Sequence, residues 1–387
     1  MSLKSIKSLL VAGFGLFLVL FYNVSVAQET AQKGYTSKAV KLDPAKIIME
    51  HVSNGHEFHF FTLNGKPYTI SLPVLLYSPT KGFSCFMSSA FEHGEATYDG
   101  YRLLEDKFME ENKLNDAKDA KGQPLYENGK IYAVDAAGMP DPAIKVYDFS
   151  LTRNVIQLFI SLILLTWIMV SIAGKYRKGL GVTTAPKGVQ NAMEPVITFV
   201  RDEVAKPNLG NRYEKYMPYL LTVFFFILIN NLVGLIPGTA NVSGNIAFTA
   251  ALGIISFIVI LFSSNKYYWG HIFNPPVPFL IKIIMVPIEI MGIFTKPFAL
   301  IIRLFANMIS GHIIILSFIL LIFIFGAMNT SLGWGTSPLF VLFSVFIYLL
   351  EILVAFIQAF IFANLTAVFI GQAFEGHGEH GKDAIMV

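Results

Sequence analysis

The sequence has little charge and almost no cysteine. Lys, Arg, Asp and Glu together make up 14% of the 387 residues, against about 25% in a typical soluble chain. The charges nearly balance at +3, which argues against a nucleic-acid binder that must neutralise many phosphates. The single cysteine, Cys85, excludes an internal disulfide and the paired thiolates of a zinc or iron–sulfur site. Apolar residues, by contrast, make up 54% of the chain, which predicts a membrane protein.

Several enzyme and metal signatures are also missing. The chain has no GxxxxGK[ST] phosphate loop, no GxSxG nucleophile elbow and no HExxH zinc pair. We therefore expect that the chain is not an enzyme by itself and holds no cofactor. Two histidine groups could be interpreted as metal sites: His51 with His56 and His59, and His377 with His380. The first has no cysteine and would alternate across a strand, and the second lies in a Gly-rich tail, so we predict no metal site.

The charges are distributed unevenly, which divides the chain into four parts. Residues 28–150 hold 13 Lys and Arg and 17 Asp and Glu, a soluble-like composition. Residues 1–27 have two lysines, an apolar run and small residues at the end, which is the pattern of a secretory signal peptide. An uncleaved first helix is the alternative. We therefore predict an exported domain at 28–150, a membrane domain at 151–374 and a cytoplasmic tail at 375–387.

The exported domain carries signals of β structure. Its β-leaning stretches are residues 58–63, 68–77 and 130–134, and Asn-Gly pairs occur at 54–55, 64–65 and 128–129. Because Asn-Gly suits tight hairpin turns, these signals predict a small, partly β-structured domain. For its role we expect a peripheral cover or an assembly surface.

Long apolar runs in the rest of the chain predict an all-α polytopic membrane protein with about five membrane-crossing helices. The runs are residues 154–173, 217–236, 245–264 and 276–374, the last interrupted by NTSLGWGTSP at 329–338. Because Gly, Pro and hydroxyl residues favour turns, the interruption predicts a hairpin between helices at 298–325 and 339–372. At about 1.5 Å per residue these helices would be about 42 and 50 Å long. Both exceed a hydrocarbon core of about 30 Å, so we expect strong tilt.

Basic residues set the predicted orientation. Those after the first span are Lys175, Arg177, Lys178 and Lys187. By the positive-inside bias that side is cytoplasmic. Residues 182–204 mix charged and apolar positions and predict an amphipathic helix on the membrane surface. Alternation then places the C-terminus in the cytoplasm, in agreement with an exported N-terminal domain.

Ionisable side chains are rare in the last apolar run. From residue 297 to 374 the charged side chains are Arg303 and Glu351, and the histidine is His312. Such residues are costly in lipid and are therefore candidates for a functional site, although Arg303 could instead snorkel to the interface from near a helix start. If the two helices pair about a turn near residue 331, His312 comes level with Glu351 and Arg303 with Gln358.

The spacing of these residues suggests that they have different roles. Asn307 follows Arg303 by four residues, so the two share a helix face, whereas His312 follows Arg303 by nine residues and points elsewhere. A His and a Glu at one depth can pass a proton, or can form an ion pair that only fixes the hairpin. An arginine keeps its proton and can act as a fixed positive gate. The pattern predicts a proton path that ends at this gate, with a moving carboxylate supplied by another chain.

Three segments resemble subunit a of bacterial F-type ATP synthases. They are KPFALIIRLFANMISGHI at 296–313, EILVAFIQAFIFANLTAVFIGQA at 351–373 and NNLVGLIPG at 230–238. The resemblance implies a stationary proton-channel subunit of the cell inner membrane. Its outer and inner half-channels would exchange protons with carboxylates of the c-ring and couple proton flow to ring rotation and ATP synthesis. It also implies the c-ring, peripheral-stalk subunit b and the remainder of the complex as partners, and H+ as the ion, although the ring decides between H+ and Na+.

The resemblance also assigns roles to individual residues. Arg303 matches the essential arginine that faces the c-ring. Asn307 and Gln358 match positions associated with the channels near that arginine. His312 and Glu351 match the polar pair of the outer half-channel, in which some family members carry Glu on the first helix and His on the second. The reversed order keeps both partners.

The sequence departs from the family at two places. Gly234 stands where certain bacterial members carry Asp, so we expect no clear contribution from that position to the outer path. Asn231 remains nearby and is expected to substitute in part. The N-terminal domain is also larger than the short N-terminus of many relatives. A cation/proton antiporter is the alternative function, but it would place ion-binding carboxylates inside the membrane, and this chain offers only Glu351 at depth.

Overall fold

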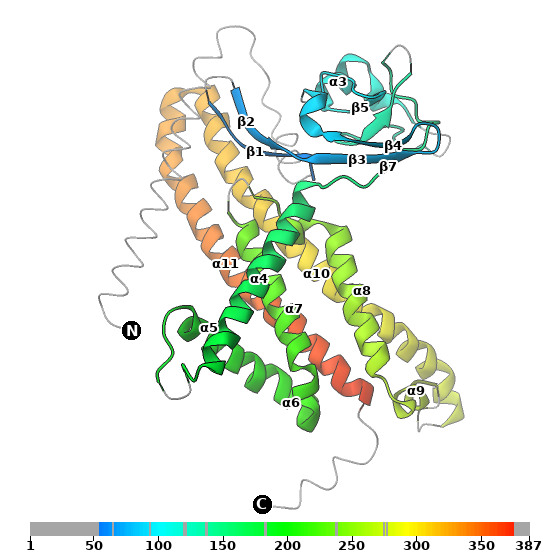
Figure 1. Cartoon of the computed structure of the whole chain (residues 1–387), viewed down its shortest axis with the longest axis vertical. Helices are drawn as coiled ribbons and strands as arrows, with labels where there is room; N and C mark the ends of the chain where they lie inside the picture. Colours follow the sequence, from blue (N-terminus) through cyan, green and yellow to red (C-terminus); the bar gives the residue numbers. More distant parts are fainter. Residues whose placement is uncertain are drawn as a thin grey trace, which may run out of the picture. The chain divides into compact units, whose positions relative to one another are not determined.

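The computed structural model describes residues 54–63, 66–92, 94–118, 122–135, 138–181, 184–236, 239–273, 275 and 278–374 (Figure 1). The described residues form two units, one of residues 56–150 and one of residues 54–55 with 151–374. The predicted signal peptide and cytoplasmic tail, with His51, His377 and His380, lie outside the described residues.

Short antiparallel sheets make up the first unit. Strand β1 (Glu57–Leu63) pairs with β2 (Lys66–Ser71), β3 (Pro73–Ser78) lies between β4 (Gly82–Met87) and β7 (Tyr147–Asp148), and β5 (Tyr101–Leu103) pairs with β6 (Ile131–Ala133). Helix α3 (Asp106–Glu111) and the 3₁₀ turns η1 (Ser88–Phe91) and η2 (Leu114–Asp116) complete the unit. The expected β structure is confirmed, although the stretch 68–77 is two strands and the sequence reasoning missed β4, β5 and β7.

The core of the first unit lies on one side of β3. Alternate residues of a strand point to opposite faces, and Val74 and Leu76 are fully buried while Tyr77 is exposed. The core residues are Val74, Leu76, Phe91, Tyr101, Leu103, Ile131 and Ala133. The opposite side of β3 therefore contributes nothing to this core.

A hydrogen-bonded pair, the buried His56 and the exposed Asp148, joins the two ends of the first unit. His56 Nε2 lies 3.0 Å from Asp148 Oδ2, and Ser150 N donates to Asp148 Oδ1 at 2.8 Å. Burial by itself would raise the pKa of Asp148, but the hydrogen bonds from His56 and Ser150 outweigh it and hold that pKa below its usual value. His56 thus has a structural partner in a carboxylate that is distant in sequence.

The second unit is helical. Its elements are α4 (Arg153–Arg177), α5 (Val189–Phe199), the π-helix η3 (Val200–Ala205), α6 (Lys206–Leu209), η4 (Gly210–Arg212), α7 (Tyr213–Gly234), η5 (Val242–Gly244), α8 (Ile246–Ser263), α9 (Lys266–Phe273), α10 (Phe279–Met328) and α11 (Thr330–Phe374). Among the described residues, five helical segments are long and apolar enough to cross a membrane. This confirms the predicted polytopic helical class. The amphipathic helix expected at 182–204 begins at Val189, and its position on a membrane surface stays a prediction.

The predicted ten-residue hairpin loop at 329–338 is wrong. Helix α10 ends at Met328 and α11 begins at Thr330, so only Asn329 is extended. Gly333 serves close packing instead, because a Cβ there would lie 2.6 Å from the Cα of Gly326 across the hairpin. Asn329 Oδ1 accepts a hydrogen bond from Ser331 N at 2.9 Å, as a helix N-cap does. One residue therefore reverses the chain.

Both C-terminal helices are longer than expected. Helix α10 has 50 residues and α11 has 45, or about 75 and 68 Å at 1.5 Å per residue. Helix α10 was predicted to begin at Phe298. It begins at Phe279 instead and contains Pro287 and Pro297. A bilayer core of about 30 Å cannot contain such helices upright.

Small residues bring α11 close to its neighbours. Its fully buried alanines are Ala355, Ala359, Ala363, Ala367 and Ala373. A Cβ on Gly371 would clash with the carbonyl oxygen of Asn208 in α6. Small residues allow helix backbones to approach in membranes, where packing rather than hydrophobicity drives association. This packing holds the polar residues of α11 at defined depths.

Candidate functional site

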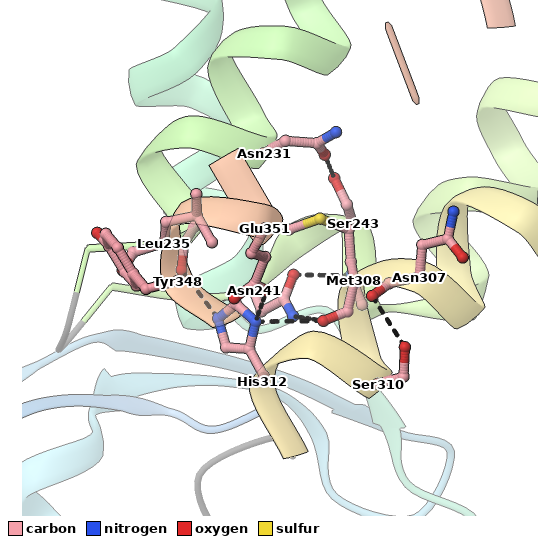
Figure 2. Close-up of polar contacts among 12 residues, drawn as sticks. Asn231, Leu235, Asn241, Ser243, Asn307, Met308, Ser310, His312, Tyr348 and Glu351 are labelled. Atoms are coloured by element: carbon pink, nitrogen blue, oxygen red, sulfur yellow. Dashed lines mark hydrogen bonds and ion pairs between the residues drawn. The ribbon is translucent and has the colours of Figure 1, made fainter. Parts of the chain in front are cut away.

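A buried histidine–glutamate pair links α10 to α11. His312 Nδ1 lies 2.9 Å from Glu351 Oε1 (Figure 2). The glutamate is 4% exposed and the histidine half-buried. The structure thus brings together the two residues that the predicted pairing about a turn near residue 331 placed at one level. Each side chain points from its own helix toward the other.

The backbone of α7 determines the state of the histidine. His312 Nε2 lies 3.1 Å from the carbonyl oxygen of Gly234. Because a carbonyl oxygen only accepts hydrogen bonds, Nε2 carries a hydrogen and donates it. The exchangeable proton of this pair is then the one between Nδ1 of His312 and Oε1 of Glu351, and Nδ1 also lies 3.2 Å from the carbonyl oxygen of Met308. Gly234, from whose side chain nothing was expected, contributes through its carbonyl.

Glu351 fits against α10 because residue 311 is glycine. A Cβ on Gly311 would lie 2.6 Å from Glu351 Oε1 and 2.7 Å from its Cδ. Even alanine would therefore push the carboxyl group away from His312. The other carboxyl oxygen, Oε2, is buried and has no hydrogen-bond partner in the part of the chain that the structure describes.

Polar groups from the loop between α7 and α8 extend this site. Ser243 Oγ donates to Asn231 Oδ1 at 2.6 Å, and both residues are buried. Asn241 Nδ2 donates to the carbonyl of Met308 at 3.3 Å. Figure 2 shows these groups beside the histidine and glutamate. Of them, the sequence reasoning identified only Asn231.

Tyr348 is another residue that the sequence reasoning missed. Its hydroxyl donates to the carbonyl of Leu235 at 3.3 Å, next to the carbonyl of Gly234. Tyr348 precedes Glu351 by three residues, so the two lie on one face of α11. That spacing was the available signal. The end of α7 is thus held from both α10 and α11.

Arg303 has very different surroundings. It is the twenty-fifth of the 50 residues of α10, and its side chain is exposed. Among the described residues it has no hydrogen-bond or ion-pair partner. Snorkelling from a helix start is disfavoured, because Arg303 lies about 36 Å along the helix from Phe279 at 1.5 Å per residue.

Asn307, one turn after Arg303, connects to α11. Its Nδ2 donates to Gln358 Oε1 at 3.0 Å, and Gln358 is 2% exposed. The predicted pairing placed Gln358 level with Arg303, whereas its observed partner, Asn307, lies one turn further along α10. That prediction assumed helices that pair evenly about a turn near residue 331. Reversal at Asn329 would place Gln358 still further from Asn307, so α10 and α11 do not pair evenly about the turn.

The fold and the site together define a class: a multi-pass helical membrane protein with ionisable side chains inside its helical bundle. Comparison with known proteins specifies the family. Residues 155–371 match the family described as ATP synthase A chain, which is more than half of the sequence. The chain therefore belongs to the ATP synthase subunit a family. This subunit is part of the membrane sector of the synthase and is not itself catalytic.

Curated relatives give the same result. The chain is 47% identical over 250 residues to ATP synthase subunit a of Chloroherpeton thalassium, an alignment that covers 63% of this chain and 72% of the relative. It is 44% identical over 254 residues to ATP synthase subunit a 2 of Chlorobaculum tepidum, with 64% and 70% covered. Residues 47–149 match a separate family described as a domain of unknown function, DUF8433.

Proposed function

We propose that this chain is the stationary half of a proton channel, which passes protons to and from carboxylates on a rotating c-ring and so couples proton flow to ATP synthesis. The observation that carries the proposal is Arg303: an exposed arginine, unpaired within the described chain, at the middle of a 50-residue membrane helix. A charge at such a position is costly unless it meets a partner. The partner with the required chemistry is a carboxylate from another chain.

In this proposal the buried pair is the outer relay. One proton moves between Oε1 of Glu351 and Nδ1 of His312 over 2.9 Å, and Oε2, which has no hydrogen-bond partner among the described residues, is where an incoming proton binds. In one state the imidazole is cationic and the carboxyl anionic, and in the other both are neutral. Because Nε2 donates to Gly234 in both states, the transfer needs no rotation of the ring. The geometry therefore supports a relay in which Glu351 takes up and releases the proton through Oε2, while His312, held between the carbonyls of Gly234 and Met308, stores it on Nδ1.

Arg303 is the gate between two paths. Its guanidinium stays protonated, so it cannot carry a proton itself. Its positive charge repels a free proton and stabilises a ring carboxylate that has released one. Asn307, one turn away and bonded to Gln358, is positioned to orient polar groups between the relay and the gate. A direct leak of protons past the arginine is thereby suppressed.

The proposed orientation of the chain in the membrane follows from the positions of its basic residues. Lys175, Arg177 and Lys178 at the end of α4 assign that end to the cytoplasm, so residues 28–150 are exported and the C-terminus is cytoplasmic. Alternation then places the loop between α7 and α8, with Asn231 and Ser243 beside it, on the outer side. The relay next to this loop is then the outer half-channel, in the bacterial inner membrane. Peripheral-stalk subunit b and the c-ring are the proposed neighbours.

The direct test is ATP-driven proton pumping in inverted membrane vesicles with the Arg303→Ala chain. We expect pumping to be lost while the complex assembles normally, because no fixed charge holds the ring carboxylate. Ile302→Ala is the matched control, since Ile302 is the preceding residue, also exposed at 39%, and carries no charge. Full pumping by Arg303→Ala would overturn the proposal.

The proposed ring partner has a separate test. In a Cys85→Ser chain, a cysteine at Ala306, exposed one turn from Arg303, is expected to cross-link to c-ring subunits that carry a cysteine near their carboxylate. A cysteine at Leu304, which is 0% exposed, is the control and should not react. If instead the purified chain alone exchanged Na+ for H+ in vesicles, the antiporter alternative would replace the proposal.

A further inference from the structure

The first unit carries an unpartnered sheet face made of apolar and aromatic side chains. We name it the aromatic face and define it by Leu75, Tyr77, Phe83, Cys85, Met87, Tyr147 and Phe149. Strand β3 is the centre of this sheet, with β4 and β7 on its two sides. Figure 1 shows these three strands in one layer, with β5 and α3 on one side of it.

The register places these side chains on one face. Tyr77 pairs with Phe83 on β4 and with Tyr147 on β7, and directly paired residues share a face. The ring centroids of Tyr77 and Tyr147 are 6.3 Å apart. Leu75 pairs with Cys85 in the same register. The aromatic face is therefore continuous across all three strands.

The aromatic face is exposed although the core needs only the other side of β3. Phe83 is 66% exposed, Phe149 65% and Met87 47%. None of the seven residues is charged. The solvated face of an antiparallel sheet usually carries polar residues. A contiguous apolar patch on such a face marks an interaction surface.

The attachment of this face to the membrane domain identifies what covers it. Phe149 N donates to Leu75 O at 2.9 Å, and Leu75 N donates to Ser150 Oγ at 3.1 Å, so the end of the domain is bonded to β3. Arg153, four residues after Phe149, is the first residue of the membrane-crossing helix α4. Four residues span at most about 14 Å, which keeps one edge of the face near the level where that helix enters the bilayer.

We propose that the aromatic face docks on the lipid surface of the membrane, at the boundary between headgroups and acyl chains. Tyr and other amphipathic rings are enriched at this boundary because one end is apolar and the other polar. The short connection to α4 keeps the aromatic face near the bilayer, and its seven side chains provide the surface that binds lipid. The domain then lies against the bilayer, and this proposal does not depend on the proton path.

The single cysteine makes a direct experiment possible. Cys85 is exposed and belongs to the aromatic face, so an environment-sensitive fluorophore can be attached there in the assembled complex. The complex is placed in phosphatidylethanolamine–phosphatidylglycerol vesicles with or without lipid that carries a nitroxide near the top of its acyl chain. We expect a blue shift of the emission and loss of intensity with the nitroxide lipid.

Two further chains make the result specific. The control is Cys85→Ser with Glu111→Cys, which places the dye at the exposed end of α3; this dye should respond to aqueous iodide and not to the nitroxide lipid. In the labelled Cys85 chain, Phe83→Glu together with Phe149→Glu should weaken the lipid quenching, with normal ATP-driven pumping.

Either of two outcomes would overturn the proposal. If the Cys85 dye behaves like the Glu111→Cys control, the aromatic face is in water. If it is protected from both iodide and nitroxide lipid, a protein covers the face. Loss of pumping in Arg303→Ala tests the proton path and is independent of these results.

Discussion

The two ionisable sites of the C-terminal hairpin have opposite surroundings. The His312–Glu351 pair is satisfied within the chain, with contacts of 2.9 Å between the two side chains and 3.1 Å to Gly234. Arg303, nine residues earlier on the same helix, is exposed and has no such partner among the described residues. A group with its partners in place can do its chemistry inside one chain. A group without them indicates where a second chain has to contribute.

The free-energy cost of a missing partner also differs between the two sites. Removing one member of a buried pair leaves the other uncompensated, at a cost of about 3–5 kcal/mol. An arginine in a membrane helix without a partner already carries a cost of about 2.5 kcal/mol or more, which an arriving carboxylate relieves. The first site should thus be sensitive to changes within this chain, and the second to changes in its partner.

After the loss expected for Arg303→Ala, the largest effect within the chain is expected at the relay itself. Glu351→Ala should lower ATP-driven proton pumping by about 100-fold or more, the usual contribution of a positioned proton-transfer group. The exchanged chain, with His312→Glu and Glu351→His together, should recover most of the activity, because the two partners are kept. If the exchanged chain pumps no better than Glu351→Ala, the relay interpretation fails.

A subtler change tests the geometry of the relay without removing either partner. Gly311→Ala puts a Cβ within 2.6 Å of Glu351 Oε1, and the carboxyl group must move away from His312. A displacement of about 1 Å can cost up to about 100-fold, so pumping should fall between the wild-type and Glu351→Ala values. Gly292→Ala on the same helix is the control, because its Cβ would meet nothing within 4 Å. Equal pumping by both variants would show that the carboxyl position is not critical.

A smaller effect is expected between the two sites. Asn307→Ala removes the donor to the buried oxygen of Gln358, a loss of about 1 kcal/mol or a few-fold in rate. Ser310→Ala is the comparison, since the Ser310 hydroxyl donates to the carbonyl of Asn307 in its own helix. Proton pumping in the same vesicles measures both. An effect of Ser310→Ala as large as that of Asn307→Ala would remove the special role of the Gln358 contact.

The smallest effect is expected outside the membrane. The pKa of Asp148 is held below its usual value, so the folded first unit gains stability above the unfolded pKa of about 3.9. This gain is lost as the pH falls below about 4 and through the folded pKa. Protease resistance of the first unit in the purified complex, measured between pH 7 and 3, should show the loss. Asp148→Asn should be less resistant at pH 7 and less dependent on pH over this range, and an unchanged profile would contradict the role of the pair.

Some features could be predicted because they depend on composition and spacing alone. The five spans follow from apolar runs, because a helix must satisfy its backbone hydrogen bonds inside lipid. The pairing of His312 with Glu351 was predicted from their near-symmetric distances from a turn near residue 331, although the chain reverses at Asn329. The β structure of the first unit follows from β-leaning stretches and Asn-Gly pairs.

Other features could not be predicted because they depend on contacts between distant segments. Gly333 looks like a turn residue in the sequence, yet against Gly326 it allows two helices to touch. Gly234 has no side chain to attract attention, and only its carbonyl reaches His312. The partner of Gln358 is Asn307, a contact that even pairing of the two helices about the turn does not predict.

The sequence by itself determined the membrane class, the number of spans and the identity of the three ionisable residues, since apolar length and rare charges leave few alternatives. Only the tertiary structure decided that Asn329 alone reverses the chain, that a backbone carbonyl holds His312, and that Arg303 lies exposed in the middle of its helix. The reason is physical. Hydrophobicity acts along the chain and is visible in one dimension, whereas a hydrogen bond or a glycine contact exists only once two helices have packed.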